Sequence, residues 1–257
     1  MADVQRTPVI AGNWKMNKFI AEAAATTSEL VPLVSGVSGV KIIVCPVFTA
    51  LSATADAAKG SNVEVGAQNC YTKESGAYTG EISPHMIKDA GCQWTIIGHS
   101  ERREYFKESN ALLNEKCAFA LANGLKVMFC IGETLEQREG GQMNDVLRTQ
   151  LVEGLQGRTD EEFKSIVIAY EPVWAIGTGV TATVEQAQEA HAFVRGVVRD
   201  TFGDAVADAV RIQYGGSVKP DNAGELIQNP DVDGFLVGGA ALQAESFAAI
   251  IKAGAAN

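Results

Sequence analysis

The sequence lacks the features of a fibrous, disordered or membrane-spanning chain. Of its 257 residues only 7 are Pro, and its 26 Gly show no three-residue period, which excludes a collagen-like repeat. No apolar run approaches the roughly 18 residues that a membrane-spanning helix needs. The first residues, MADVQRT, show neither the basic nor the apolar stretch of a secretory signal. With 46% hydrophobic residues, we predict a globular, cytoplasmic protein with no membrane partner.

Positive charge is also scarce. The chain has 21 Lys and Arg against 31 Asp and Glu, which gives a formal net charge of −10 and argues against a nucleic-acid partner. A small anionic ligand is still compatible with this charge. One local Lys and a few backbone N–H groups act at contact distance, whereas exposed charges beyond about 8 Å are largely screened at physiological salt.

The sequence contains few cysteines, and their spacing matches no paired motif. The five cysteines form an odd number without a C-x-x-C pair, and most lie in apolar runs: Cys45, Cys70, Cys92, Cys117 and Cys130. This pattern predicts buried, reduced thiols in a reducing compartment. We expect neither disulfides nor a metal site.

Eight short, nearly continuous apolar segments predict strands that are buried on both faces of a parallel sheet. They span residues 8–14, 41–46, 63–68, 94–99, 126–132, 165–172, 210–216 and 234–239. Amphipathic helices are predicted between them, most clearly over 185–202, where Thr183 and Gln186 fit a capping box. Another helix over about 110–122 is predicted to end at Asn123-Gly124. Eight strand–helix units without a linker favour an α/β fold with a closed (β/α)₈ barrel, as a single domain over residues 1–257, rather than an open doubly wound sheet.

Polar residues and glycines recur at or just past the carboxyl ends of the predicted strands. They are Asn13, Lys15, His99, Glu171, Gly215 to Ser217, Gly238 and Gly239. In a barrel these strand ends meet at one rim, so residues far apart in the chain line one pocket. The segment GTGVTA at 177–182 matches a dinucleotide-binding pattern, but it does not join a predicted strand directly to a helix. We therefore predict no dinucleotide site.

Four strings taken together resemble the triosephosphate isomerase family: AGNWKMN, GHSERR, AYEPVWAIGTG and YGGS. They occur in the family's order, and GAYTGEIS at 76–83 and CIGE at 130–133 also match. The resemblance covers the chain from end to end and implies a TIM barrel. It implies a cofactor-free and metal-free isomerase of glycolysis and gluconeogenesis that interconverts dihydroxyacetone phosphate and D-glyceraldehyde 3-phosphate through an enediolate.

The resemblance also implies the catalytic roles. Glu171 is expected to move the proton, His99 to act on the oxygens, and Lys15 to stabilise negative charge. Position alone leaves other interpretations open, namely a solvated carboxylate, a structural histidine and a surface lysine. Because His99 precedes a predicted helix, we expect the positive helix end to lower the pKa of His99. A Schiff-base lyase that uses Lys15 and a phosphate-binding protein without turnover remain the alternative functions.

Glycine pairs after the last two predicted strands indicate a phosphate site, because glycine lets backbone N–H groups approach a phosphate closely. Turn chemistry explains either pair alone equally well. The expected substrate-binding residues are Asn13, Lys15, Gly177, Ser217, Gly238 and Gly239. The residues after Glu171 are expected to form a lid that excludes water on closing. This lid comprises Pro172, Val173, Trp174, Ala175, Ile176, Gly177, Thr178 and Gly179.

Residues 68–83 form a long polar segment after the third predicted strand. A bare loop of this length is uncommon in a compact domain, which suggests an interface. In the family that the chain resembles, this loop docks into the partner's pocket and supports Lys15 and Asn13, with Thr79 near its tip. The resemblance therefore implies a homodimer.

Overall fold

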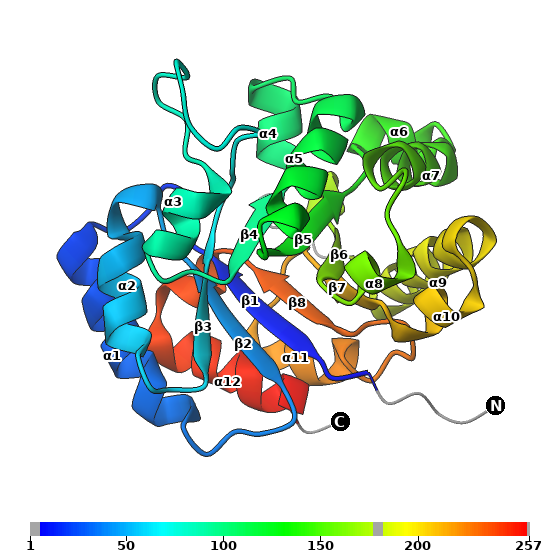
Figure 1. Cartoon of the computed structure of the whole chain (residues 1–257). Helices are drawn as coiled ribbons and strands as arrows, with labels where there is room; N and C mark the ends of the chain where they lie inside the picture. The colour runs from blue at the N-terminus through cyan, green and yellow to red at the C-terminus, as the bar shows by residue number, and fades with distance from the viewer. Residues whose placement is uncertain (1–5, 177–181, 256–257) are drawn as a thin grey trace.

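The protein folds into a closed barrel of parallel strands. The computed structural model describes residues 6–176 and 182–255, and the barrel order β1 to β8 follows the order of the strands in the chain (Figure 1). The strands are β1 Val9–Asn13, β2 Lys41–Cys45, β3 Val63–Ala67, β4 Trp94–Ile97, β5 Lys126–Ile131, β6 Ile166–Tyr170, β7 Arg211–Tyr214 and β8 Gly234–Val237. Each strand lies within a segment predicted from the sequence, so the TIM-barrel fold is confirmed.

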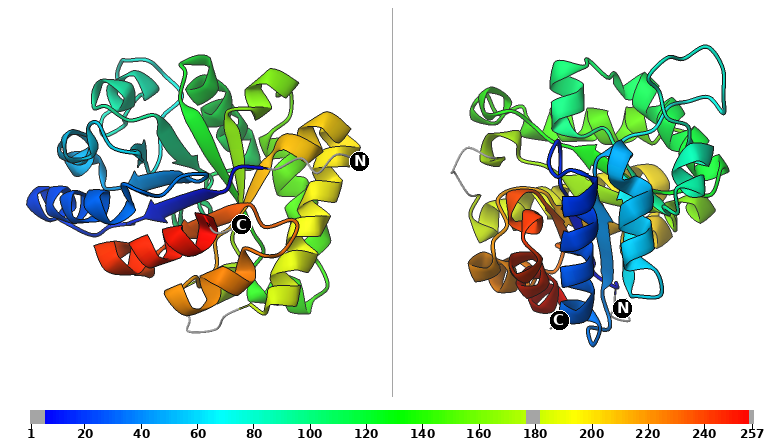
Figure 2. Two further views of the ribbon diagram at one scale, coloured as in Figure 1. Left: turned by 90° about the horizontal axis from the view of Figure 1, so that it is seen from below. Right: turned by 90° about the vertical axis from the view of Figure 1, so that its left-hand side faces the viewer.

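Helices surround the barrel, as the view from below shows (Figure 2, left). The α-helices are α1 Ile20–Val34, α2 Leu51–Ala58, α3 Pro84–Asp89, α4 Ser100–Tyr105, α5 Asn110–Ala122, α6 Leu135–Glu139, α7 Met143–Gly154, α8 Asp160–Phe163, α9 Val184–Phe202, α10 Asp204–Ala209, α11 Pro220–Leu226 and α12 Ala244–Ala255. Short 3₁₀ helices within the described residues are η1 Phe48–Ala50, η2 Val173–Ala175 and η3 Gly239–Leu242. The capping box of Thr183 and Gln186 opens α9, and α5 ends before Gly124, whose φ of 75° suits glycine.

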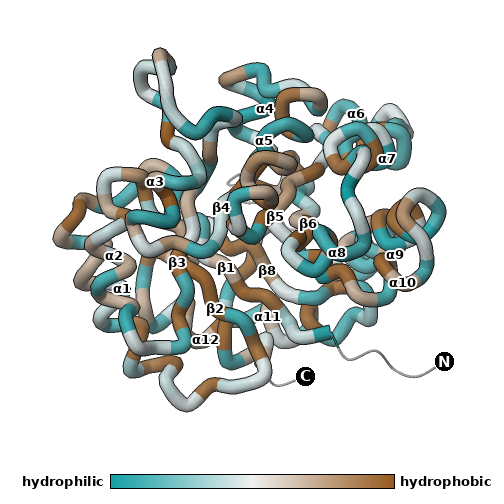
Figure 3. The backbone as a smooth tube through the Cα atoms, in the orientation of Figure 1, coloured by the Kyte–Doolittle hydropathy of each residue, from teal (hydrophilic) through white to brown (hydrophobic). Residues whose placement is uncertain are grey.

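The strands separate two apolar layers, because successive side chains of a strand point to opposite faces. One layer fills the barrel interior and includes Val9, Ala11, Ile43, Cys45, Trp94, Ile96, Met128, Cys130, Val167, Ala169 and Leu236. The other layer packs between the strands and the helices and includes Ile10, Ile42, Val44, Phe129 and Ile168. The hydrophobic colouring of the strands follows this burial (Figure 3). A rigid, filled barrel thus carries the loops at its two mouths.

The structure of the described residues also tests the predictions about the cysteines, a membrane-spanning helix and a metal site. All five cysteines are free and buried, and burial raises the pKa of Cys70, Cys92 and Cys117 to about 12. None of the described helices is long and apolar enough to cross a membrane. Nor do any three described His, Cys, Asp or Glu residues gather as a possible metal site. The single domain over 1–257 stays a prediction.

Candidate active site

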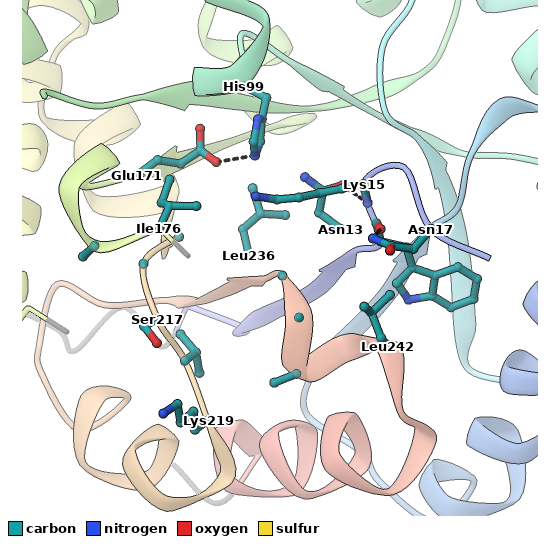
Figure 4. Close-up of a pocket in the computed structure, with 18 residues that line it drawn as sticks. Asn13, Lys15, Asn17, His99, Glu171, Ile176, Ser217, Lys219, Leu236 and Leu242 are labelled. Atoms are coloured by element: carbon teal, nitrogen blue, oxygen red, sulfur yellow. Dashed lines mark hydrogen bonds and ion pairs between the residues drawn. The ribbon is translucent and has the colours of Figure 1, made fainter. Parts of the chain in front are cut away.

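A pocket of about 490 Å³ lies at the carboxyl ends of the strands. The segments after β1, β4, β6, β7 and β8 all contribute to it, and Figure 4 shows their side chains around one cavity. The residues predicted from the sequence that line it are Asn13, Lys15, His99, Glu171, Ala175, Ile176, Gly215, Gly216, Ser217, Gly238 and Gly239. The barrel therefore brings together residues from positions 13 to 239 of the chain.

Glu171 and His99 form a buried pair at this rim. Glu171 directly follows β6 and is 2% exposed, while His99 follows β4 and is 5% exposed. The Glu171 Oε1 atom lies 2.9 Å from His99 Nε2 (Figure 4). The backbone N–H of Ser100 donates to Glu171 Oε2 at 3.0 Å. Glu171 is thus not a solvated loop carboxylate, since both of its oxygens are held inside the protein.

The hydrogen bond at His99 Nδ1 determines the tautomer of the neutral imidazole ring. The backbone N–H of Glu101, at the start of α4, donates to His99 Nδ1 at 3.2 Å. A proton on Nδ1 would oppose this N–H, so the neutral ring carries its proton on Nε2, toward Glu171.

The pKa of His99 departs from the expectation based on the helix end. Burial lowers the pKa of His99, but the carboxylates of Glu171 and Glu101 outweigh burial and raise it. The expected lowering is therefore wrong for this arrangement, because Glu171 contacts the ring and the Glu101 carboxylate lies beside it. Burial would likewise raise the pKa of Glu171, yet His99 and the Ser100 N–H lower it.

Lys15 is held in an unusual backbone conformation. Its φ of 52° is rare for a residue with a side chain, and Asn13 Oδ1 accepts a hydrogen bond from the Lys15 N–H at 3.0 Å. The Gln68 side chain donates to the backbone oxygens of Lys15 and Cys45, both at 2.9 Å. The Lys15 ammonium lies 2.7 Å from Glu101 Oε1. Sequence reasoning missed Gln68 and Glu101, although Glu101 lies in the GHSERR string.

Two glycines make room for Glu171. A Cβ at Gly132 would lie 1.8 Å from the backbone oxygen of Glu171, and one at Gly215 would lie 2.9 Å from Glu171 Cγ. Gln150, on α7, holds Gly132 through hydrogen bonds to both its N–H and its C=O. Sequence reasoning missed this role of Gly132, and the CIGE string was the available signal.

Ser217, Gly238 and Gly239 also line the pocket, and Figure 4 shows Ser217 apart from the Glu171–His99 contact. A Cβ at Gly238 would approach no closer than 3.9 Å to Lys15 Cε, and one at Gly239 would meet nothing within 4 Å. Packing within the described chain therefore does not explain these two glycines.

The first part of the predicted lid is anchored to Glu133. Pro172 precedes η2, and the fully buried Glu133 carboxylate accepts hydrogen bonds from Tyr170 Oη and Trp174 Nε1. The Val173 N–H donates to the Glu133 backbone oxygen at 3.1 Å. Gly177, Thr178 and Gly179, which complete the predicted lid, lie outside the described residues. Glu133 is a further residue whose role sequence reasoning missed.

Thr79 does not line this pocket. It is exposed, in the loop of residues 68–83 that extends from the barrel between β3 and α3 (Figures 1 and 2). No residue of this loop lines the pocket of its own chain, and Gln68 at its start contacts Lys15 there.

Fold and site together define a (β/α)₈-barrel enzyme whose pocket presents a carboxylate, an imidazole and an ammonium group at the carboxyl rim. A family model described as triosephosphate isomerase matches residues 8–254. Curated proteins of that name from Geotalea uraniireducens and Trichlorobacter lovleyi are 54% and 55% identical to this chain over 247 residues, which is 96% of this chain and 98% of each relative. The relative from Chloroherpeton thalassium is 51% identical over 248 residues, with the same two coverages. The chain belongs to the triosephosphate isomerase family and interconverts dihydroxyacetone phosphate and glyceraldehyde 3-phosphate.

Proposed function

We propose that Glu171, His99 and Lys15 carry out this isomerisation through an enediolate. The observation that carries the proposal is the 2.9 Å contact between Glu171 and His99, both nearly fully buried at a pocket that also contains Lys15. The Glu171 carboxylate takes a proton from the carbon next to the carbonyl and returns it to the neighbouring carbon. His99 Nε2–H gives its proton to the carbonyl oxygen and takes up the proton of the neighbouring hydroxyl, and the Lys15 ammonium stabilises the negative charge of the enediolate.

Substrate must change the contacts of both partners. Glu171 has one oxygen on His99 and the other on Ser100, so its carboxylate turns toward the pocket only when these contacts break. The His99 Nε2–H then becomes available to a substrate oxygen. Substrate binding thus separates the base from the hydrogen-bond donor that holds it in the structure described.

We further propose that the phosphate binds at the glycine side of the pocket. The proposed substrate-binding residues are Asn13, Lys15, Gly177, Ser217, Gly238 and Gly239. Ser217 can donate its hydroxyl, and unshielded N–H groups at Gly238 and Gly239 suit a phosphate oxygen. With the phosphate there, Lys15 lies between it and Glu171, which orients the reacting carbons toward the base.

Isotope exchange tests the proposed roles. Turnover in D₂O should place deuterium on the carbon that receives the proton from Glu171. The Glu171→Gln variant should lose exchange and turnover together while it still binds inorganic phosphate. Turnover that continues in this variant contradicts the assignment.

Borohydride trapping separates the isomerase from a Schiff-base lyase. Borohydride added during turnover should leave the mass of Lys15-containing peptides unchanged. A reduced covalent adduct at Lys15 would instead support the lyase chemistry.

We also propose a homodimer formed through the loop of residues 68–83, with Thr79 at the interface. Large apolar side chains are exposed near Lys15, on this loop and just after β4, and Met16 and Phe19 are 93% and 82% exposed. Those on the same segments and on the helix α3 after the loop are Ile20, Tyr78, Met86, Tyr105 and Phe106. An exposed apolar surface of this kind marks a protein–protein contact.

Sedimentation equilibrium tests the dimer. The protein should sediment at twice the 27.2 kDa of one chain, and Thr79→Arg should shift it toward the monomer. Leu135→Asp, at an exposed apolar residue of α6, is the control that should leave the dimer intact. A monomeric parent protein overturns the proposal. Cytoplasmic location stays a prediction.

A further inference from the structure

A second cavity, of about 590 Å³, lies at the amino ends of the strands, at the mouth of the barrel opposite the active site. Its charged lining residues are Arg6, Lys41, Lys126, Lys164 and Arg211, and no Asp or Glu of the described chain lines it. Lys41, Lys126 and Arg211 are the first residues of β2, β5 and β7. Because parallel strands begin at one mouth, these three side chains converge there.

The carboxylates near this mouth do not balance its cations. Lys41 Nζ lies 2.7 Å from Glu64 Oε1, while Lys126 Nζ lies 3.6 Å from Glu64 Oε2, which already accepts the Trp94 indole N–H. Burial alone would raise the pKa of Glu64, but hydrogen bonds from Lys41 and Trp94 lower it, so Glu64 carries one full negative charge. Lys126 therefore shares a carboxylate that Lys41 already neutralises.

The other cations differ in how well they are paired. Arg6 pairs with Asp233 at 2.6 Å, and Lys164 pairs with Glu161 on the surface. Arg211 forms no ion pair with a carboxylate of the described residues, although Asp233 is near enough to act on it electrostatically, and its side chain donates a long 3.5 Å hydrogen bond to the Lys164 backbone oxygen. Burial lowers the pKa of Arg211 and Asp233 raises it, and the guanidinium nevertheless stays charged. A half-buried guanidinium without an anionic partner is costly unless an anion reaches it.

We propose that this cavity binds a small oligoanion with two or more phosphate or carboxylate groups. The planar fork of Arg211 suits bidentate contact with one anionic group, and Lys126 and Lys164 supply point charges for another. The volume falls within the range of small-molecule sites. The concentration of cations is local, since the chain as a whole carries a net charge of −10.

A purely structural role does not explain why so many cations surround this cavity. Closing the barrel mouth requires a partner for the half-buried Glu64, and Lys41 supplies it. It does not require Arg211, Lys126 and Lys164 around an open cavity. An anion bound in this cavity would give Arg211 and Lys126 a partner of their own, which the carboxylates of the described residues do not.

Calorimetric titration with inorganic pyrophosphate tests the proposal. The titration is made with the active site occupied by a saturating equilibrium mixture of the two triose phosphates, so that pyrophosphate reports on the opposite mouth. One pyrophosphate should bind per chain. Arg211→Gln should weaken its affinity by about ten-fold or more, because a hydrogen bond to a charged group is lost.

Lys126→Gln is the second variant, in case Arg211→Gln does not fold, and it should weaken binding by about three-fold or more. Lys59→Gln removes an exposed cation that follows α2 outside this cavity and should leave the affinity unchanged. Each folded variant should keep the kcat/KM of the parent, which confirms an intact barrel.

Several results would overturn the proposal. They are absence of pyrophosphate binding when the active site is occupied, equal affinity in the Arg211→Gln or Lys126→Gln variant, and an equal loss in Lys59→Gln, which would show diffuse surface charge. Binding of an acidic peptide without any binding of pyrophosphate would assign the mouth to a protein partner instead.

Discussion

The two mouths of the barrel differ in how deeply their ionisable pairs are buried. At the carboxyl mouth, Glu171 and His99 are almost fully buried and contact each other at 2.9 Å. At the amino mouth, Glu64 and Lys41 form an ion pair whose side chains are 24% and 40% exposed. Water screens the second pair and not the first, so the same kind of contact is strong at one mouth and weak at the other.

The difference arises from the residues that adjoin the strands at each mouth. After the carboxyl ends, glycines such as Gly132 and Gly215 let the backbone and Glu171 pack closely enough to exclude water. At the amino ends, long basic side chains surround a cavity and keep their head groups partly in solvent. Burial at the carboxyl mouth therefore depends on backbone packing as much as on the ionisable residues.

Replacing the carboxylate at each mouth should have the most unequal effects. Glu171→Gln should lower kcat by about 10³-fold or more, because the base for proton transfer is lost. Glu64→Gln should leave kcat close to that of the parent, because Glu64 lies at the opposite mouth. Steady-state kinetics with glyceraldehyde 3-phosphate measures both, and a comparable loss in the two variants would contradict the contrast.

Filling the space beside Glu171 should disturb the carboxyl mouth without any change of charge. In Gly132→Ala the new Cβ would overlap the Glu171 backbone oxygen, so we expect kcat to fall by about 10²-fold and stability by about 3 kcal/mol. Gly36→Ala is the matched control, since its Cβ would meet nothing within 4 Å. Kinetics and denaturant unfolding report the two effects, and an active, stable Gly132→Ala variant would refute the packing argument.

A buried ionisable group away from both mouths should affect stability only. Burial lowers the pKa of His191 to about 4, while its Nδ1 donates to the Asp231 backbone oxygen at 3.0 Å. Below its ordinary pKa of about 6.5 the unfolded chain takes up a proton that the folded chain does not, so stability falls as the pH drops from 6.5 to 4, by about 3 kcal/mol.

Unfolding by denaturant at pH 4 and pH 7 measures this loss. His191→Gln should remove that part of the pH dependence, and its kcat/KM at pH 7 should equal that of the parent. A variant with an unchanged pH dependence would show that His191 titrates normally in the fold.

The smallest effect is expected at the amino mouth. Lys41→Gln breaks a partly exposed ion pair, so the free energy of unfolding should fall by about 1 kcal/mol or less, with kcat/KM unchanged. Thermal unfolding and kinetics on the same preparation check it. A large loss of stability would show that this pair is as strongly desolvated as the one at the carboxyl mouth.

The sequence predicted the strands because each is a short apolar segment, and hydrophobic burial is a local property of composition. It also predicted most of the pocket residues, since side chains after parallel strands must meet at one rim. It did not predict the pKa of His99, because Glu171, the carboxylate that raises this pKa most, is brought near by tertiary packing. Glu101, which also raises it, is only two residues away in the chain, but the sequence does not show that its carboxylate turns back toward the ring.

The sequence also did not reveal residues that hold a site residue from a distant segment of the chain. Gln68 supports Lys15 across 53 positions, and Glu133 holds Trp174 across 41. By itself the sequence determined the barrel, the strand ends and the types of residue placed there, because periodicity and strand order are sufficient for these. Tertiary structure alone decided which groups touch, how deeply they are buried and therefore which charges are screened, because these depend on distances between segments that are not adjacent in the chain.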